Sequence, residues 1–300
     1  MKVTGFTIIR NAVKYDYPVV ESIRSILPIC DEFIVAVGES EDETRELVAS
    51  IAPDKIKIID TKWDLSLRTG GRVLADETNK ALEAISPDTD WAFYIQADEV
   101  MHEQWLPHLV EVMERYKDDP KIEGLLVNYL HFYGSYDYIG DSRRWYRKEI
   151  RIVRPNPGLT SYRDAQGFRI NDRKLNVKET DAYMHHYGWV KPPEKQQEKQ
   201  KNFHKLWHDD TWMEKNIGDR SSFDYGNIDS LSLFKGTHPK EMIERIKKIN
   251  WVFKFDPTKK NFGLKAALLH FIEKQTGWRP GEYKNYHLLS SKTTVTSTKY

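Results

Sequence analysis

The first hundred residues alternate between short apolar runs and amphipathic segments, and this alternation constrains the fold more than any other feature of the chain. Residues 3–9, 33–37, 55–60 and 91–95 are typical of buried strands. Between these runs lie segments whose apolar residues recur at helical spacing. Strands that alternate with helices favour a parallel sheet covered on both faces. We therefore predict an α/β fold with a mixed, mostly parallel sheet and flanking helices.

The fourth apolar run ends in Gln96-Ala97-Asp98-Glu99, where two acids follow a strand directly. A buried carboxylate is costly unless it is paired or coordinated. In open α/β sheets, ligands bind outside the carboxyl ends of the strands. Adjacent carboxylates are hard oxygen ligands, which suit a divalent cation that carries phosphates. The sequence therefore predicts a ligand site at the end of this strand.

Several classes of protein are disfavoured. No Gly-x-Gly-x-x-Gly follows the first strand and no P-loop lysine motif is present, which argues against an ordinary dinucleotide or P-loop site. No apolar run approaches the ~20 residues of a membrane span. The sequence begins with a strand-like run rather than a signal peptide, and its single cysteine, Cys30, excludes an internal disulfide and is expected in the core. These features indicate the cytoplasm.

The amino-acid composition of the chain changes after the first strands and helices. Residues 134–183 are rich in Arg, Tyr, Gly and Pro, and from about residue 194 the composition becomes helical. We expect a catalytic domain over residues 1–190 and a helical extension over 191–300 that packs on it, as a lid, an acceptor wall or a membrane-proximal part. Residues 293–300 are expected to form a loose polar tail.

Basic residues gather at the C-terminal end. Residues 240–300 hold 13 Lys/Arg against 5 Asp/Glu, although the whole chain has a net charge of only +1. One interpretation is peripheral contact with an anionic membrane at its inner face, or with a phosphorylated acceptor. The other is a solvated, lysine-rich helical face.

The order of these features resembles that of the family-2 glycosyltransferases, which use nucleotide-sugars and have the GT-A fold. The shared motifs are Arg10-Asn11 after the first strand, the acidic turn around Glu39 after the second, Asn79 within a helix, and Gln96-Ala-Asp98-Glu99. The resemblance covers roughly residues 3–190. The chain departs from the family at Gln96, which replaces the first acid of Asp-x-Asp, and at Gly38-Glu39, where the family often has two aspartates.

The resemblance implies an inverting, metal-assisted transfer of a sugar from a nucleotide-sugar, most often UDP-linked, to a glycan or lipid-linked acceptor, as in cell-surface polysaccharide assembly. It implies Mn²⁺ or Mg²⁺ as the cofactor, held by Asp98 and assisted by Glu99 directly or through water. It also implies that Gln96 contacts the ribose, because an amide can hydrogen-bond a hydroxyl. The expected nucleotide-sugar ligands are Arg10, Asn11, Glu39, Arg72, Gln96 and Asp98.

Two further roles follow from the resemblance. In GT-A enzymes a late histidine can complete the metal site, and His186 is favoured over His185 here, the alternative being a packed aromatic segment. The catalytic base is a carboxylate near the acceptor hydroxyl. Asp164 is the first candidate, and Glu149 and Asp172 compete with it. A loop acid paired with a nearby arginine is the alternative interpretation for each.

A dense basic stretch with interleaved aromatics suits phosphate contacts and sugar stacking; it comprises Arg143, Arg144, Trp145, Tyr146, Arg147, Arg151 and Arg154. We do not expect nucleic acid as a partner, because the chain has no recognisable groove-reading module and is nearly neutral. Two other functions remain open. One is a non-catalytic nucleotide-sugar or glycan-binding relative, which Gln96 motivates. The other is a nucleotidyltransferase, which the missing glycine-rich first loop disfavours.

Overall fold

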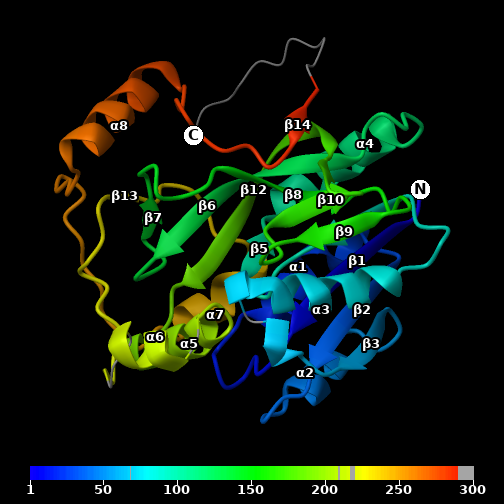
Figure 1. The fold of residues 1–300 in the computed structure, drawn as a ribbon, viewed down its shortest axis with the longest axis horizontal. Coiled ribbons are helices and arrows are strands. Elements are labelled where there is room, and N and C mark those ends of the chain that lie inside the picture. The colour runs from blue at the N-terminus through cyan, green and yellow to red at the C-terminus, as the bar shows by residue number, and fades with distance from the viewer. Residues whose placement is uncertain (68, 209, 217–219, 290–300) are drawn as a thin grey trace.

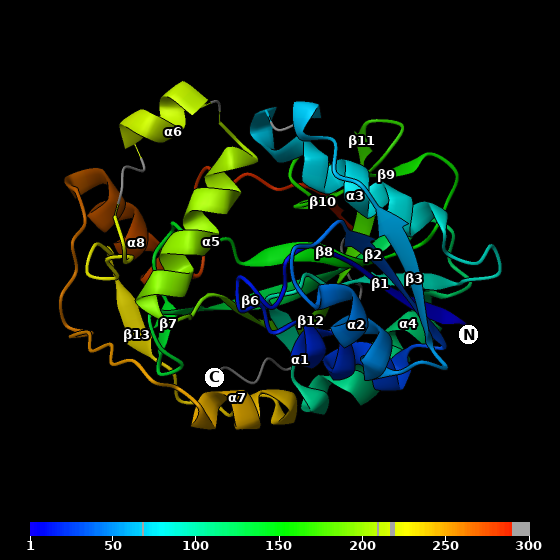
Figure 2. The ribbon, with the colours of Figure 1, turned by 90° about the horizontal axis from the view of Figure 1, so that it is seen from below.

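The computed structural model describes residues 1–67, 69–208, 210–216 and 220–289, so the tail expected over 293–300 lies outside the described residues. A twisted sheet runs through the molecule, with helices on both faces (Figures 1 and 2). Its parallel part consists of β1 (Val3–Ile9), β2 (Glu32–Gly38), β3 (Ile56–Thr61) and β4 (Trp91–Tyr94). The helices between these strands are α1 (Val19–Ile26), α2 (Thr44–Ile51) and α3 (Arg72–Glu83). The predicted α/β fold is confirmed.

Beyond β4 the sheet becomes mixed. β8 (Lys148–Val153) is antiparallel to both β4 and β6 (Gly124–Tyr133). The long strand β12 (Asn176–Trp189) runs parallel to β6 and antiparallel to β5 (Glu99–Met101). The β5–β12 register places His186 opposite Glu99. This pairing brings a late strand to the acids that follow β4.

The remaining elements cover the sheet or extend it. The helices are α4 (Leu106–Tyr116), α5 (Pro193–Lys205), α6 (Asp210–Asn216), α7 (Ile243–Lys247) and α8 (Leu264–Thr276). The strands are β7 (Tyr138–Gly140), β9 (Leu159–Tyr162), β10 (Gly167–Ile170), β11 (Arg173–Lys174), β13 (Leu231–Leu233) and β14 (His287–Leu288). Short 3₁₀ helices occur at Leu27–Ile29, Leu65–Leu67, Thr69–Gly71, Glu103–Trp105 and Lys240–Met242.

The C-terminal extension is not purely helical. It contains the expected helices α5 to α8, but β13 pairs with β7, and β14 pairs with β12. The chain therefore returns to the sheet after α8 (Figure 1). The end of β12 at Trp189 and the start of α5 at Pro193 lie next to the predicted boundary at residue 190, and the division into two domains stays a prediction.

The two largest apolar clusters of the core lie on opposite sides of the sheet. In β2, Phe33 and Val35 belong to the first cluster, whereas Ile34 and Ala36 belong to the second, because successive strand side chains point to opposite faces. Both faces are covered, which explains why the strands read as continuous apolar runs. Cys30 is buried in the first cluster, as expected. Across the described residues, no helix is both long and apolar enough to cross a bilayer.

Candidate active site

A pocket of about 140 Å³ lies at the carboxyl ends of β1 and β4. The sheet contributes the ends of two parallel strands, and α5 and the β9–β10 connection close the pocket from outside. This is the position at which open α/β sheets bind ligands. The lining residues are Ile8, Ile9, Arg10, Tyr17, Trp63, Leu74, Tyr94, Gln96, Ala97, Asp98, Asp164, Ala165, Lys199, Asn202, Phe203 and Leu206.

The two acids after β4 point in different directions. Asp98 lines the pocket, whereas Glu99 is completely buried behind it. Arg151 donates to both oxygens of Glu99, with Nε 2.9 Å from Oε2 and Nη2 2.7 Å from Oε1. Tyr129 Oη and the backbone N–H of Gln96 donate to the same carboxylate at 2.6 and 3.0 Å. Glu99 thus holds the Gln96–Asp98 turn in place, and its expected assistance to a metal ion stays a prediction.

Asp98 forms an ion pair with Lys199, a residue of α5. The Lys199 ammonium donates to Asp98 Oδ2 at 2.9 Å and to the Gly188 carbonyl at 2.8 Å. Although burial opposes it, the Lys199 ammonium and neighbouring His186 hold the pKa of Asp98 well below its usual range. Burial also opposes ionisation of Lys199, but Asp98 raises the pKa of Lys199 above its ordinary value. Both groups of the pair are therefore charged.

His186 lies beside this ion pair, with Nε2 3.7 Å from Asp98 Oδ1. His131 Nε2 is 2.8 Å from the Tyr146 carbonyl, which can only accept, so His131 Nδ1 is left to accept from His186 Nδ1 at 3.0 Å. This chain fixes the His186 ring. Gly188 is required here, because a Cβ at that position would come within 2.7 Å of both Asp98 Oδ2 and His186 Nε2.

His185 points to the other side of β12. It is buried, its ring stacks on Phe132 with centroids 5.5 Å apart, and burial lowers its pKa to about 3. His185 is therefore a packed aromatic residue, and His186 is the histidine that lies beside Asp98.

The donor set at Asp98 does not fit a divalent cation. Asp98 and His186, the predicted ligands, are neighbours, but the Asp98 charge is already balanced by Lys199 at 2.9 Å. Gln96 is neutral, and Glu99 is engaged by Arg151. Within the described part of the chain, no cluster of three or more His, Cys, Asp or Glu side chains has the geometry of a metal site. Mg²⁺ is usually bound through one or two carboxylates together with waters and substrate phosphates, and the carboxylate available here, Asp98, is already held by Lys199.

Asp164 lies on the pocket wall, in the connection between β9 and β10. Its neighbours Arg163 and Ala165 both have left-handed backbone conformations, with φ of 56° and 61°, which are unfavourable for non-glycine residues. Asp164 Oδ1 is buried and accepts no hydrogen bond from the described residues, and burial raises the pKa of the carboxyl group. A strained loop thus holds at the pocket a carboxylate whose Oδ1 has no hydrogen-bond partner among the described residues, which is the arrangement expected of a base.

The competing acids lie elsewhere. Glu149 is buried in β8, beside a neighbouring hollow that also contains Gln166 and Asn285, and burial raises its pKa to about 8. Asp172 is exposed in the turn between β10 and β11, with φ of 64°. Neither residue lines the pocket at Asp98.

Three of the predicted nucleotide-sugar ligands do not line the pocket. Asn11 is buried in the turn after β1, where its Oδ1 accepts from the Glu41 N–H at 2.8 Å. Glu39 is exposed, and its carboxylate lies 3.8 Å from Lys62 Nζ. Arg72 is exposed at the start of α3. Arg10, Gln96 and Asp98 do line the pocket, and the Arg10 guanidinium lies 5.7 Å from the Trp63 ring centroid. The ligand roles of all six stay predictions.

Several arginines of the arginine-rich stretch make contacts within the protein, and the expected substrate contacts stay a prediction, because residues 143–147 also line the hollow beside Glu149. Arg151 is the buried partner of Glu99. Arg154 lies 4.5 Å from the Trp91 ring centroid and donates to the Ile122 carbonyl. Arg147 donates to Glu282 at 2.9 Å. These guanidinium groups tie the sheet and the C-terminal segment together.

The structure adds one charged residue, Lys199, that the sequence analysis did not identify. Its signal is a helical stripe on α5, in which Gln196, Lys199, Phe203 and Leu206 follow one another three or four residues apart. Gln196, Lys199 and Leu206 are buried. A lysine within such a stripe faces the protein rather than solvent, and it needs an acid as its partner.

The chain was compared with curated sequences, solved structures and family models. A search of curated protein sequences found no match. Among solved structures, S. aureus TarS is 16% identical with a TM-score of 0.38, covering 68% of this chain and 39% of TarS. Residues 1–349 of TarS in complex with UDP are 15% identical with a TM-score of 0.39, covering 73% and 70%. Glucosyl-3-phosphoglycerate synthase from Mycobacterium tuberculosis, in complex with Mn²⁺, UDP and phosphoglyceric acid, is 20% identical with a TM-score of 0.31, covering 43% of each chain.

This chain spans less than half of the TarS chain, so the structural likeness carries no activity with it. The family assignment comes instead from a sequence model of the family. The model of glycosyl transferase family 2 matches residues 7–187, which is more than half of the 300 residues. The protein therefore belongs to glycosyl transferase family 2.

Proposed function

We propose that the protein is an inverting glycosyltransferase that moves a sugar from a UDP-sugar to a glycan or lipid-linked acceptor, in the assembly of a surface polysaccharide. One observation carries the proposal: Asp98, Gln96 and Asp164 converge with Arg10 and Lys199 on one pocket at the strand ends. Acidic, amide and cationic groups in one pocket suit a substrate with hydroxyls, a diphosphate and a proton to be removed. Family membership supports the same reaction class.

The residues that line the pocket are suited to different roles in the reaction. The Gln96 amide is suited to hydrogen-bond a ribose hydroxyl, and the rings of Tyr17, Trp63 and Phe203 are suited to stack on a base or sugar. Asp164 is placed to accept the proton of the acceptor hydroxyl. Because the donor set does not fit a divalent cation, the expected Mn²⁺ or Mg²⁺ enters no step of this mechanism.

The pocket must widen to admit the donor. Its volume of about 140 Å³ is smaller than the roughly 300–1,000 Å³ of ordinary ligand pockets. Asn202, Phe203 and Leu206 close it from α5 and the residue after it. We infer that the C-terminal end of this helix, with Asn202, Phe203 and Leu206, moves outward when the nucleotide-sugar binds, while Lys199 keeps its contacts with Asp98 and Gly188.

Thermal unfolding with and without nucleotides tests the donor class. We expect UDP and a UDP-sugar to raise Tm, whereas GDP and CMP do not, because a ligand that binds only the native state stabilises it by mass action. At about 100 times the Kd, the gain is roughly 2.7 kcal/mol. Asp172→Asn, outside the pocket, is the control and should show the same shift as the wild type. The absence of any shift with UDP or UDP-sugars would contradict the proposal.

Product analysis separates the remaining alternatives. A transferase releases UDP when an acceptor is supplied. UDP binding without turnover on any acceptor would favour the non-catalytic relative, and consumption of a nucleoside triphosphate with release of pyrophosphate would favour a nucleotidyltransferase.

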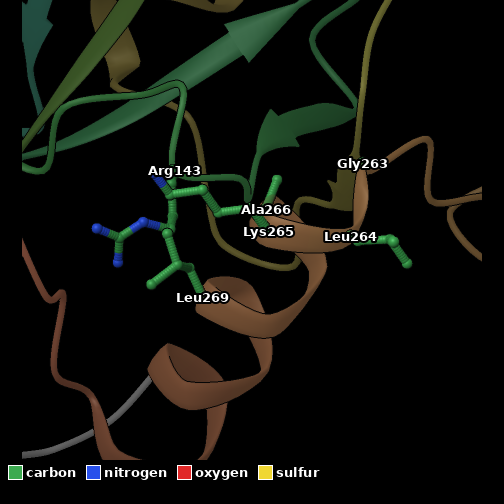
Figure 3. Close-up of a pocket in the computed structure, with 6 residues that line it drawn as sticks. All are labelled: Arg143, Gly263, Leu264, Lys265, Ala266 and Leu269. Atoms are coloured by element: carbon green, nitrogen blue, oxygen red, sulfur yellow. The ribbon is translucent and has the colours of Figure 1, made fainter.

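The apolar face of α8 supports contact with an anionic membrane. No residue of α8 is buried, and Leu264, Leu268 and Phe271 are 94%, 61% and 61% exposed. Trp278 just beyond it is 65% exposed, and the exposed lysines at 259, 265 and 274 flank the same region. Figure 3 shows the first turns of α8 beside Arg143, around a hollow of about 460 Å³. An apolar face with flanking lysines suits the surface of an anionic bilayer such as the inner leaflet.

Vesicle sedimentation tests this contact. We expect the protein to bind phosphatidylserine vesicles more tightly than phosphatidylcholine vesicles, and less tightly as salt is raised. Leu268→Glu/Phe271→Glu should weaken binding at least about tenfold, because burying one such side chain contributes roughly 1.5–3 kcal/mol. Val110→Glu, at an exposed apolar position on α4, is the matched control. Equal binding by both variants would contradict the membrane contact.

A further inference from the structure

We propose that Lys199 is the cation that this transferase directs at the diphosphate of its donor, in the position where a divalent metal ion is expected. The inference rests on the proposed use of a nucleotide-sugar, and it adds that the site works without a divalent ion. Its basis is the arrangement of charges around Asp98, which no other part of the mechanism explains.

The contacts of Lys199 leave it available to a ligand. An ammonium group has three protons. Lys199 donates one to Asp98 Oδ2 at 2.9 Å and one to the Gly188 carbonyl at 2.8 Å, and it also lines the pocket. The Tyr17 ring lies beneath it, with its centroid 5.0 Å from Nζ. One proton therefore remains for an acceptor in the pocket, and Asp98 and Gly188 fix the direction in which the ammonium points.

The same residues explain the departure from Asp-x-Asp. A divalent ion carries two positive charges and is usually bound through one or two carboxylates together with substrate phosphates, whereas a single ammonium is balanced by one carboxylate. With Gln96 neutral and Glu99 paired with Arg151, Asp98 is the one carboxylate in contact with Lys199 in the described structure. Because Gln96 is uncharged and replaces an acid, it adds no second negative charge beside the Asp98–Lys199 pair. Arg10 lines the same pocket and adds a second positive charge for the diphosphate.

In the reaction, the acceptor oxygen forms a bond to the anomeric carbon as the bond from that carbon to the β-phosphate oxygen breaks. The electron pair of the broken bond stays on the phosphate oxygen, and the acceptor proton passes to Asp164. Lys199 keeps its proton and donates a hydrogen bond to the leaving diphosphate. A fixed cation at the point where negative charge develops lowers the barrier without reorganisation.

Calorimetric titration with UDP tests the inference on the wild-type protein. We expect the Kd for UDP to be the same within about twofold in excess EDTA and in excess Mn²⁺, because Lys199 neutralises the diphosphate in both. A Kd that weakens tenfold or more in EDTA and recovers with Mn²⁺ would overturn the inference and leave the proposed function standing. Absence of UDP binding under both conditions would instead overturn the proposed function.

Variants of α5 give a second readout. Lys199→Ala should raise the Kd for UDP roughly 10- to 100-fold in either buffer, as expected for loss of a hydrogen bond between charged groups. Asp98→Asn/Lys199→Gln, which leaves no uncompensated buried charge, should show the same loss while it stays folded. Lys195→Ala is the matched control, since Lys195 lies one turn earlier on α5 and pairs with Glu198 at 3.1 Å. Unchanged UDP affinity in the folded double variant would contradict the role of Lys199.

Discussion

Replacement of Asp164 by Asn is expected to lower kcat roughly 10²- to 10⁴-fold, while the Kd for UDP stays within about twofold. Asn keeps the shape of the side chain but cannot accept a proton from the acceptor hydroxyl. The UDP affinity should persist because the groups assigned to the diphosphate, Lys199 and Arg10, are unchanged. Steady-state kinetics with a UDP-sugar, together with UDP titration, measure both quantities.

Glu149→Gln is the informative comparison. Glu149 is also buried and carries a raised pKa, but it lies outside the pocket at Asp98. We expect its replacement to affect kcat far less than the Asp164 variant. A loss of kcat in Glu149→Gln that equals or exceeds the loss in Asp164→Asn would indicate that Glu149, and not Asp164, is the base.

The pH dependence distinguishes the two acids independently. A base acts only when deprotonated, so kcat/KM falls as the pH drops through its pKa in the free enzyme. Burial raises the pKa of Asp164, so kcat/KM should begin to fall at a pH above the pKa of an ordinary aspartate. If Glu149 were the base, kcat/KM would fall near pH 8, because burial raises the pKa of Glu149 to about 8. A fall of kcat/KM near pH 8 would therefore contradict the assignment of Asp164 as the base.

The part of the fold that follows from local pattern was predictable. β1 occupies Val3–Ile9 as expected, and β4 ends at Tyr94, one residue before the predicted end. These strands are buried on both faces, so their apolar runs are continuous and easily recognised. The residues after β4 also line a pocket, as Gln96 and Asp98 show, and the use of this pocket as a ligand site stays a prediction.

Contacts between distant segments could not be predicted from one sequence. Glu99 and Asp98 are adjacent acids with the same local signature, yet one pairs with Arg151 and the other with Lys199. What separates them is the alternation of side chains at the start of β5, which sends Glu99 inward. The partners lie 52 and 101 residues away, and no spacing rule connects them to the acids. The sequence thus indicated that Asp98 lies at the end of β4, but it did not indicate which cation balances the Asp98 carboxylate.

Replacement of Arg151 by Met is expected to destabilise the fold by about 3–5 kcal/mol, the largest stability effect we foresee. Arg151 and Glu99 are 1% and 0% exposed, so the variant leaves a carboxylate buried without its counter-charge. Chemical unfolding, monitored by circular dichroism, measures the loss. The exposed pair Arg45–Asp60 is the control, and Arg45→Met should cost no more than about 1 kcal/mol.

The double variant Arg151→Met/Glu99→Gln separates charge burial from packing. Removal of both charges should recover much of the lost stability, because a buried ion pair replaced by neutral groups of similar volume is often close to neutral in energy. The amide oxygen of the Gln side chain can still accept from the Gln96 N–H, and its NH2 group can donate to Tyr129 Oη, which also accepts, so the turn that presents Asp98 is retained. If the double variant is as unstable as Arg151→Met, the guanidinium stabilises the sheet through its packing between Tyr94 and Tyr129, whose ring centroids both lie 5.4 Å from it, rather than through its charge.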